Sequence, residues 1–237
     1  MFEPEGHKAS DARPAIVFFF GGGWVGGSPG QFYPHCKYLA SRGMWAASAE
    51  YRVKSRNGTT PFECVADGKS AVRYIRTHAS ELGIDPEKVA AGGGSAGGHV
   101  AASTGVIDGH EEAGEDTKVS SKPVALCLFN PVIDTGPKGY GYNKLGERYK
   151  ELSPVEHVTE DDPPAILFHG TADTTTPFSN ATDFQARMKK AGNRCGVVSF
   201  EGQKHGFFNY GRGDGTAYKK CIAAMDEFLT SLGLLLN

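Results

Sequence analysis

Two glycine-flanked serines are the first candidates for chemistry in this chain. The pattern Gly-x-Ser-x-Gly occurs around Ser28 and again around Ser95. Such a serine can act as a nucleophile when it lies on a sharp turn from a strand to a helix and the N–H of the next residue can stabilise an oxyanion. Pro29 follows Ser28 and has no N–H, whereas Ala96 follows Ser95. We therefore predict that Ser95 is the nucleophile and that Ser28 is a loop or helix-cap residue.

A serine nucleophile needs a base that removes its proton and a carboxylate that orients the base. Asp173 follows a predicted strand, and His205 lies in the loop between the last predicted strand and the last predicted helix. The carboxyl ends of parallel strands meet at one edge of a sheet, so we expect both side chains near Ser95. His99, one helical turn after Ser95, is the rival base. We predict a structural role for His99, because that position lies behind the turn and not over the exposed hydroxyl.

A run of glycines can supply the donors of an oxyanion hole. Gly21, Gly22 and Gly23 directly follow the apolar stretch that ends at Phe20. Consecutive glycines let backbone N–H groups approach a tetrahedral intermediate closely. We predict Gly22, Gly23 and Ala96 as the donors. The run lacks the lysine of a P-loop and the spacing of a dinucleotide fingerprint, so a nucleotide site is not expected.

Buried strands and amphipathic helices must alternate along the chain to position these residues. Short apolar runs predict strands over residues 15–20, 44–50, 124–129, 165–169 and 197–200. Residues 88–93 are rich in Ala and Gly and have poor strand propensity, but the alternation of elements predicts a strand there as well. Helices are predicted over 31–42, from a capping box at Thr60 to residue 82, after Ser95, over 177–191 and over 216–232. The alternation predicts an α/β fold: a three-layer sandwich with a mostly parallel sheet of about six strands.

Two further segments receive local predictions. Ser153 begins a second capping-box pattern, which ends at Glu156. The acidic stretch over residues 108–116 is expected to be a solvated loop without a function. No internal repeat or domain boundary is visible, so residues 1–237 are predicted to form one domain.

Composition excludes several classes of protein. The 237 residues include 25 Lys and Arg against 27 Asp and Glu, a net charge of −2 that gives no basic field for nucleic acid or an anionic membrane. No apolar run approaches the roughly 18 residues of a membrane span, and no signal peptide is visible, so a cytoplasmic location is expected by default, or a secreted one if the chain is a piece of a longer precursor. Five widely spaced cysteines without C-x-x-C predict neither a disulfide framework nor a metal site, and no cofactor is expected.

The motifs taken together resemble the α/β-hydrolase superfamily, in particular its esterase and lipase branch with an H-G-G-G-W segment. That branch includes carboxylesterases and acetyl or feruloyl esterases. The resemblance covers nearly the whole chain and rests on five segments: Gly21-Gly22-Gly23-Trp24, Glu50-Tyr51-Arg52, Gly93 to Gly98, His169 to Asp173, and His205-Gly206-Phe207. It implies a catalytic triad of Ser95, Asp173 and His205, with Gly22, Gly23 and Ala96 as the oxyanion positions.

The chain departs from the family at two places. Phe20 stands where the family usually has a histidine that braces the oxyanion loop, and phenylalanine can brace it only by packing. Only 14 residues precede the first clear strand, whereas the family has two earlier strands there. We therefore expect the strand over 44–50 at or near a sheet edge, where a homodimer could form.

From the short N-terminus we also expect no large cap of the kind that covers the acyl pocket of related lipases. Residues 136–150, which carry several tyrosines among glycines, are predicted to form a small lid. We predict substrate contacts for Trp24, Tyr140 and Tyr142. Without a large apolar insertion, short acetyl-like acyl groups are expected, on a small-molecule or carbohydrate ester.

The predicted function is hydrolysis of short-chain carboxylic esters through an acyl-enzyme on Ser95. Two alternatives stay open at this point. One is a peptidase related to the catalytic domain of prolyl oligopeptidase, which shares the fold and the order of the triad. The other is a ligand-binding module on the hydrolase fold that has lost catalysis, which Phe20 and the short N-terminus keep in consideration.

Overall fold

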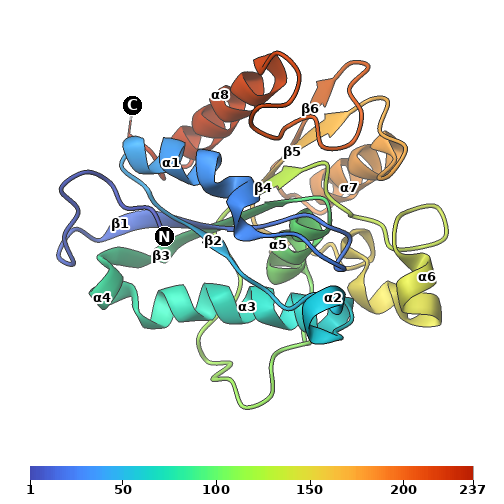
Figure 1. Cartoon of the computed structure of the whole chain (residues 1–237). Helices are drawn as coiled ribbons and strands as arrows, with labels where there is room; N and C mark the ends of the chain where they lie inside the picture. Colours follow the sequence, from blue (N-terminus) through green and yellow to red (C-terminus); the bar gives the residue numbers. More distant parts are fainter. Residues whose placement is uncertain (237) are drawn as a thin grey trace.

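A computed structural model describes residues 1–236 as helices packed around one parallel sheet (Figure 1). The strand order is β2-β1-β3-β4-β5-β6, and every neighbouring pair is parallel. The strands are β1 Arg13–Phe19, β2 Trp45–Ala49, β3 Ile84–Gly94, β4 Leu126–Phe129, β5 Ala165–Gly170 and β6 Cys195–Phe200. The predicted parallel sheet of about six strands is confirmed.

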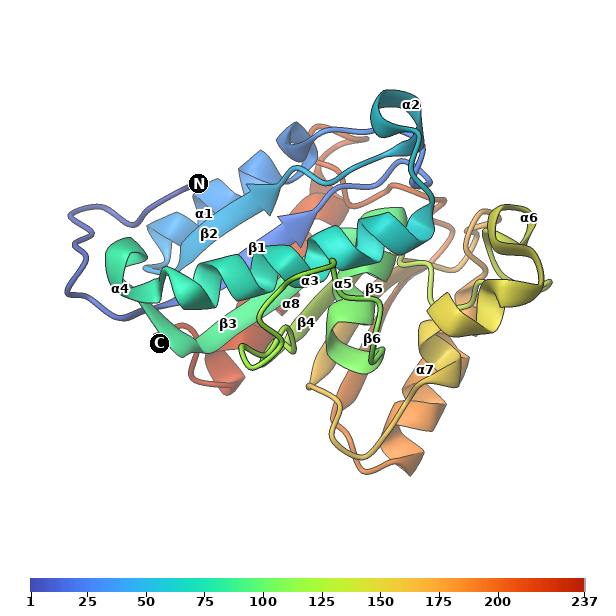
Figure 2. The same cartoon turned by 90° about the horizontal axis from the view of Figure 1, so that it is seen from below.

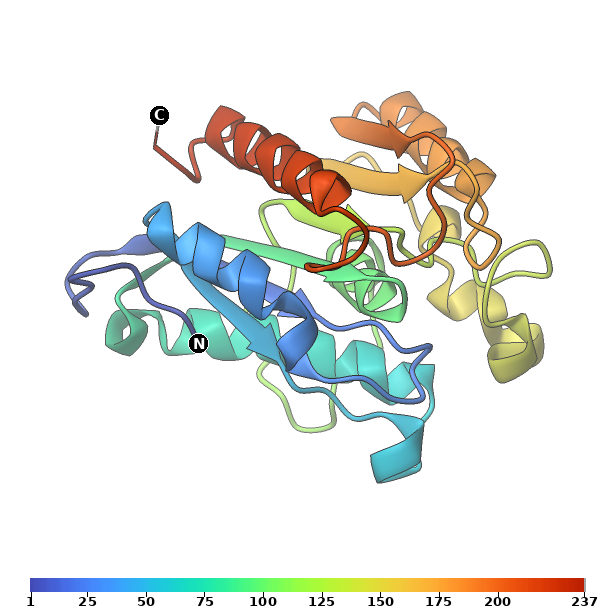
Figure 3. The ribbon, with the colours of Figure 1, turned by 45° about the horizontal axis from the view of Figure 1, so that its top comes forward.

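Helices cover both faces of this sheet. On one face lie α1 (Tyr33–Ser41) and α8 (Thr216–Ser231), which Figure 3 shows in front of the strands. On the other face lie α3 (Pro61–Thr77), α5 (Ala96–Val106) and α7 (Phe178–Lys190), as seen in Figure 2. The predicted three-layer sandwich is therefore confirmed.

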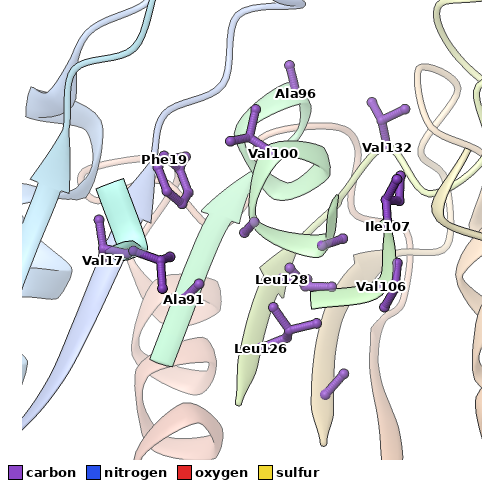
Figure 4. Close-up of a cluster of buried hydrophobic side chains, with 14 of the residues drawn as sticks. Val17, Phe19, Ala91, Ala96, Val100, Val106, Ile107, Leu126, Leu128 and Val132 are labelled. Carbon is purple, nitrogen blue, oxygen red and sulfur yellow. The ribbon is translucent and has the colours of Figure 1, made fainter. Parts of the chain in front are cut away.

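The alternation of side chains along β1 divides the core into two halves. Val17 and Phe19 face α3 and α5, whereas Ile16 and Phe18 face α1 and α8. Figure 4 shows Val17, Phe19 and Val100 in the first half. A strand buried on both faces needs a continuous apolar run, and residues 15–20 of this chain provide one.

Two predicted helices are each divided in two. The helix expected over 31–42 is a 3₁₀ turn, η1 (Pro29–Phe32), followed by α1. The helix expected to reach residue 82 ends at Thr77, and the short α4 (Ala79–Leu82) follows. The capping box at Thr60 is present. The other short helices are α2 Lys54–Asn57, α6 Tyr142–Leu145, η2 Gly146–Leu152 and η3 Pro154–Glu156.

The second predicted capping box, at Ser153, is wrong. The segment after Ser153 is a single 3₁₀ turn, and the Ser153 side chain does not cap it. The Ser153 hydroxyl instead accepts a hydrogen bond from the N–H of Thr135 at 3.2 Å. A tertiary contact has taken the hydroxyl that the local pattern assigns to a helix end.

The acidic stretch over 108–116 is a loop, but it is not simply solvated as predicted. Glu111 lies 3.1 Å from the ammonium of Lys69, and Glu115 lies 2.8 Å from the guanidinium of Arg73. The side chains of Lys69 and Arg73 on α3 are only 2% and 8% exposed. Buried cations require partners, so the acidic loop neutralises the charges of these two side chains of α3.

Strand β2 lies at the edge of the sheet, as expected. Phe2 forms an isolated antiparallel bridge with Ala46 of β2, with N···O distances of 2.7 and 3.0 Å. The N-terminal segment thus pairs with one position of the exposed edge, while dimerisation through β2 stays a prediction. Among residues 1–236, no helix has the length and apolar character needed to cross a membrane.

Candidate active site

Ser95 lies on a sharp turn between β3 and α5. Its backbone angles are φ 54° and ψ −121°, a conformation that costs a non-glycine residue about 1 to 3 kcal/mol. Neighbouring glycines make the turn sterically feasible: a Cβ at Gly93 would collide with the backbone of Gly97, and one at Gly97 would collide with the carbonyls of Phe19 and Phe20. The strain and the two glycines expose the Ser95 side chain at the carboxyl edge of the sheet.

The three predicted triad side chains are joined by hydrogen bonds. Nε2 of His205 lies 2.9 Å from Oγ of Ser95, and Nδ1 of His205 lies 2.7 Å from Oδ2 of Asp173. The Asp173 side chain is fully buried, while that of His205 is 25% exposed. The imidazole therefore connects a buried carboxylate to a hydroxyl that solvent can reach. Three loops, after β3, β5 and β6, supply these residues.

Asp173 is anchored by its own loop as well as by His205. Its Oδ1 accepts the backbone N–H groups of Thr175 and Thr176 at 2.8 and 3.0 Å, and its Oδ2 accepts the Thr176 hydroxyl at 3.0 Å. Burial acts to raise the pKa of Asp173, but the hydrogen bonds from His205 and the backbone outweigh burial and lower the pKa. The carboxylate therefore stays ionised beside the imidazole.

The carbonyl groups of Gly21 and Gly22, in the glycine run after β1, lie against the turn at residues 25–27. The Gly22 oxygen accepts the N–H groups of Val25 and Gly26 at 3.0 and 3.2 Å, and the Gly21 oxygen lies against Gly27. In a trans peptide the N–H points opposite to the carbonyl, so the N–H groups of Gly22 and Gly23 face away from the turn at 25–27. A Cβ at Gly21 would lie 3.2 Å from Cβ of Ser95, so this loop lies beside Ser95.

Phe20 braces the glycine run by packing, as its chemistry predicts. The ring is buried and stacks on Tyr51 with a centroid distance of 4.2 Å. The Tyr51 hydroxyl donates a 2.6 Å hydrogen bond to the Phe20 carbonyl. Tyr51 therefore holds both the ring and the backbone at the point where the oxyanion loop begins.

The segment predicted as a lid lies directly on the glycine run and Trp24. Tyr140 contacts Trp24 with a ring distance of 5.6 Å, and the Lys144 ammonium donates to the Gly23 carbonyl at 2.8 Å. Trp24 is only 1% exposed, so Tyr140 and its neighbours cover it. Tyr142 points elsewhere: its hydroxyl donates to Glu147. Of the three predicted substrate contacts, only Trp24 and Tyr140 are brought together.

His99 and Ser28 lie outside the hydrogen-bonded triad. His99 is fully buried on α5 and its Nε2 lies 2.6 Å from the Leu152 carbonyl. Burial lowers the pKa of His99 to about 4. Ser28 precedes η1 and its side chain forms no cap hydrogen bond.

Three polar residues near the site were missed by the sequence interpretation. Thr176 holds Asp173, as described above. Asn130, at the end of β4, has φ 33° and accepts the N–H of Gly206 at 2.9 Å, which fixes the residue after His205. Gln31 accepts the N–H of Gly21 at 2.6 Å. The turn Asn130-Pro131 after a strand was the only sequence signal that pointed to any of them.

Two large cavities lie away from the predicted site residues. The first, of about 710 Å³, lies against α3 and is lined by charged residues such as Arg52 and Asp67. The second, of about 770 Å³, is lined by residues such as Arg76 and Pro163, and neither cavity includes a predicted site residue. Within residues 1–236, no group of three or more His, Cys, Asp and Glu side chains could hold a metal ion. The strained serine, the buried carboxylate and the parallel sheet define the molecule as an α/β-hydrolase.

Comparisons with known proteins narrow the class of α/β-hydrolase to which the chain is similar. A model of the BD-FAE family matches residues 1–137, and a model of the dienelactone hydrolase family matches residues 140–232. Esterase 2 of Thermogutta terrifontis, in its apo form, is 51% identical with a TM-score of 0.96, and the alignment covers 100% of this chain and 90% of that one. The same esterase has been solved with propionate and with butyrate bound, at 50% and 49% identity.

Curated relatives are more distant and longer. Esterase LipC of Mycobacterium tuberculosis is 27% identical over 82% of this chain and 53% of its own length. Acetylxylan esterase of Xylanibacter ruminicola is 28% identical over 92% of this chain and 44% of its own length. The chain spans about half the length of the curated relatives it matches. The chain belongs to the esterase family of α/β-hydrolases.

Proposed function

We propose that the protein is a serine esterase that cleaves short-chain acyl esters. The observation that carries this proposal is the chain of hydrogen bonds from Ser95 Oγ through His205 to the buried Asp173. Such an arrangement lets the imidazole take the serine proton while the carboxylate fixes its tautomer and stabilises the imidazolium.

The proposed reaction has two halves. Ser95 Oγ attacks the ester carbonyl, His205 accepts the serine proton, and the C–O bond to the alcohol breaks as His205 gives that proton to the leaving alkoxide. Water then attacks the acyl-enzyme, His205 takes a proton from it, and Ser95 leaves with that proton as the acid is released. The N–H groups of Gly22, Gly23 and Ala96 stabilise the oxyanion in both halves.

A short acyl group is favoured by the crowding around the oxyanion loop. Tyr140 and Lys144 press on Gly23 and Trp24, and a Cβ at Gly141 would meet the Trp24 ring at 2.7 Å. The propionate and butyrate seen in Thermogutta terrifontis esterase 2 are acyl products of this size. We propose that residues 1–237 form one catalytic domain, that 136–150 are its small lid, and that Tyr140, which covers the buried Trp24, is the aromatic residue of the lid that contacts substrate.

Carbohydrate esters are the finer substrate proposal. The acetylxylan esterase relative supports them, because it aligns with 92% of this chain. An aromatic side chain such as Tyr140 could stack on a sugar ring. Acetylated xylo-oligosaccharides would test this directly, and release of acetate no faster than from ethyl acetate would contradict it.

The first test is hydrolysis of p-nitrophenyl esters from acetyl to decanoyl, with Ser95→Ala as the control. Activity that peaks at acetyl to butyryl, falls steeply beyond and disappears in Ser95→Ala is expected. A folded wild-type protein without activity would contradict the proposal. Faster turnover of a prolyl amide than of an acetyl ester would favour the peptidase alternative.

A further inference from the structure

Two loops must stay in register for the proposed reaction, and their connection lies outside the triad. The oxyanion loop follows β1, and the loop that carries His205 follows β6 at the other end of the sheet. Between them lie the side chains of Gln31 and Asn209, which are 178 residues apart in sequence. Neither residue belongs to the triad or to the predicted oxyanion donors.

The hydrogen bonds between the two loops form a continuous chain. The Gly21 N–H donates to Oε1 of Gln31 at 2.6 Å, and Nε2 of Gln31 donates to Oδ1 of Asn209 at 2.9 Å. Nδ2 of Asn209 then donates to the Gly206 carbonyl at 2.8 Å. The Gly206 N–H completes the chain by donating to Oδ1 of Asn130 at 2.9 Å.

The direction of every bond in this chain is determined. A backbone N–H can only donate, so the Gln31 oxygen must face Gly21 and the Gln31 amide nitrogen must face Asn209. The Asn209 oxygen is thereby used, and its amide nitrogen faces Gly206. Each amide has one orientation that satisfies both neighbours, so this series of hydrogen bonds fixes the position of one loop relative to the other.

Both bridging residues stand on a rigid base. Phe32, next to Gln31, and Phe208, next to Asn209, are buried and their rings stack at 5.7 Å with an angle of 23°. Gln31 also lies within η1, and its backbone N–H donates a 3.3 Å hydrogen bond to the Ser28 carbonyl. The hydrogen bond between Gln31 and Asn209 is therefore flanked by the contact between Phe32 and Phe208 in the core.

We propose that Gln31 is a positioning residue that holds the oxyanion loop in register with the His205 loop through Asn209. Phe20 directly precedes the glycine run, and its phenyl ring offers no hydrogen bond to that run. Gln31 supplies that hydrogen bond from ten residues further along the chain. The peptide that it fixes directly precedes Gly22 and Gly23, the proposed oxyanion donors. This inference rests on the proposed esterase reaction.

Gln31→Met tests the proposal, because methionine keeps the length of the side chain and removes both hydrogen bonds. We expect kcat on p-nitrophenyl butyrate to fall about tenfold with KM within twofold, because the oxyanion donors act mainly in the transition state. Affinity for a trifluoromethyl ketone, whose adduct places an oxyanion in the same hole, should fall by a similar factor. Gln185→Met is the matched control, since it removes a 3.1 Å hydrogen bond from a glutamine amide on α7 to the Cys195 carbonyl at the start of β6.

Asn209→Ala supplies an independent variant. If the bridge acts as one unit, Asn209→Ala should lower kcat with the same unchanged KM, and the double variant should lose little more than either single variant. A kcat for Gln31→Met within twofold of Gln185→Met, or fully multiplicative losses in the double variant, would overturn the inference. An inactive wild-type protein would instead contradict the proposed function itself.

Discussion

The reaction centre and the neighbouring aromatic cluster each contain a histidine, but one imidazole is hydrogen-bonded and partly exposed whereas the other is buried without hydrogen bonds. At the carboxyl edge of the sheet, both nitrogens of His205 have partners and its side chain is a quarter exposed. In the aromatic cluster, which consists of Phe18, Phe32, Phe129, Phe208 and Tyr218 around His35, the imidazole is fully buried and neither nitrogen forms a hydrogen bond.

This difference separates catalysis from stability within one small molecule. Directional hydrogen bonds hold the reaction centre, so substitutions there should change rates more than folding. Apolar contacts hold the aromatic cluster, so substitutions there should change the free energy of unfolding more than rates. The next four predictions test that separation.

Asp173→Asn should have the largest effect. An asparagine can donate to His205 and stabilise the wrong tautomer, so kcat should fall about 10⁴-fold, or about 5.5 kcal/mol in the activation barrier. Steady-state kinetics on p-nitrophenyl butyrate would measure it. Asp162→Asn is the control, because Asp162 also accepts hydrogen bonds in a loop but lies away from Ser95; a comparable loss there would show that the effect is structural.

Phe18→Ala should lower the free energy of unfolding and leave kcat nearly unchanged, the reverse of what Asp173→Asn should do. Phe18 is fully buried and stacks on Phe32 at 4.9 Å, so truncation should cost about 3 to 5 kcal/mol in the free energy of unfolding. Urea unfolding measures this loss, while kcat per folded molecule should stay within about threefold. Phe62→Ala, at a half-buried position, should cost much less. A large loss of kcat in folded Phe18→Ala would contradict the separation.

His35→Leu should flatten the dependence of stability on pH. Burial lowers the pKa of His35 from 6.5 to about 3 in the folded protein. Between these pH values only the unfolded chain binds the proton, so the wild-type protein loses stability as pH falls below 6.5, by about 2 kcal/mol at pH 5 from this group. Urea unfolding at pH 7 and pH 5 measures the difference, and parallel losses in both proteins would contradict it.

Thr176→Val should have the smallest effect of the four. Valine keeps the shape but removes the hydroxyl that donates to Asp173 at 3.0 Å, so kcat should fall about threefold to tenfold, or about 1 kcal/mol. Thr104→Val removes a buried hydroxyl that bonds within α5 and serves as the control. If both variants keep the wild-type kcat, the Thr176 hydroxyl does not support the carboxylate.

Much of the reaction centre could be predicted from sequence because its parts have local signatures. Gly93 and Gly97 mark the turn around Ser95, and Pro29 excludes the other serine motif by its missing N–H. The apolar run before the glycines at 21–23 and the capping box at Thr60 also carry their structure locally. In each case the local backbone conformation, over a few neighbouring residues, requires that type of residue.

The remaining features depend on partners that are distant along the chain. Ser153 has the local pattern of a helix cap, yet its hydroxyl bonds to Thr135. The acidic loop reads as solvent-exposed, yet it neutralises buried Lys69 on α3. Local patterns cannot show which of several polar partners a side chain will meet after the sheet has assembled.

The alternating strands and helices, and the residues able to attack, transfer a proton and stabilise an oxyanion, can be predicted from sequence because backbone geometry and apolar periodicity act over short distances. Folding of the whole chain was needed to show that Tyr51 stacks on Phe20, that Asn130 holds the His205 loop, and that Gln31 reaches Asn209. Those contacts exist because the strand order brings separate loops together, up to 178 residues apart for Gln31 and Asn209, and hydrogen bonds then require each donor to find one acceptor.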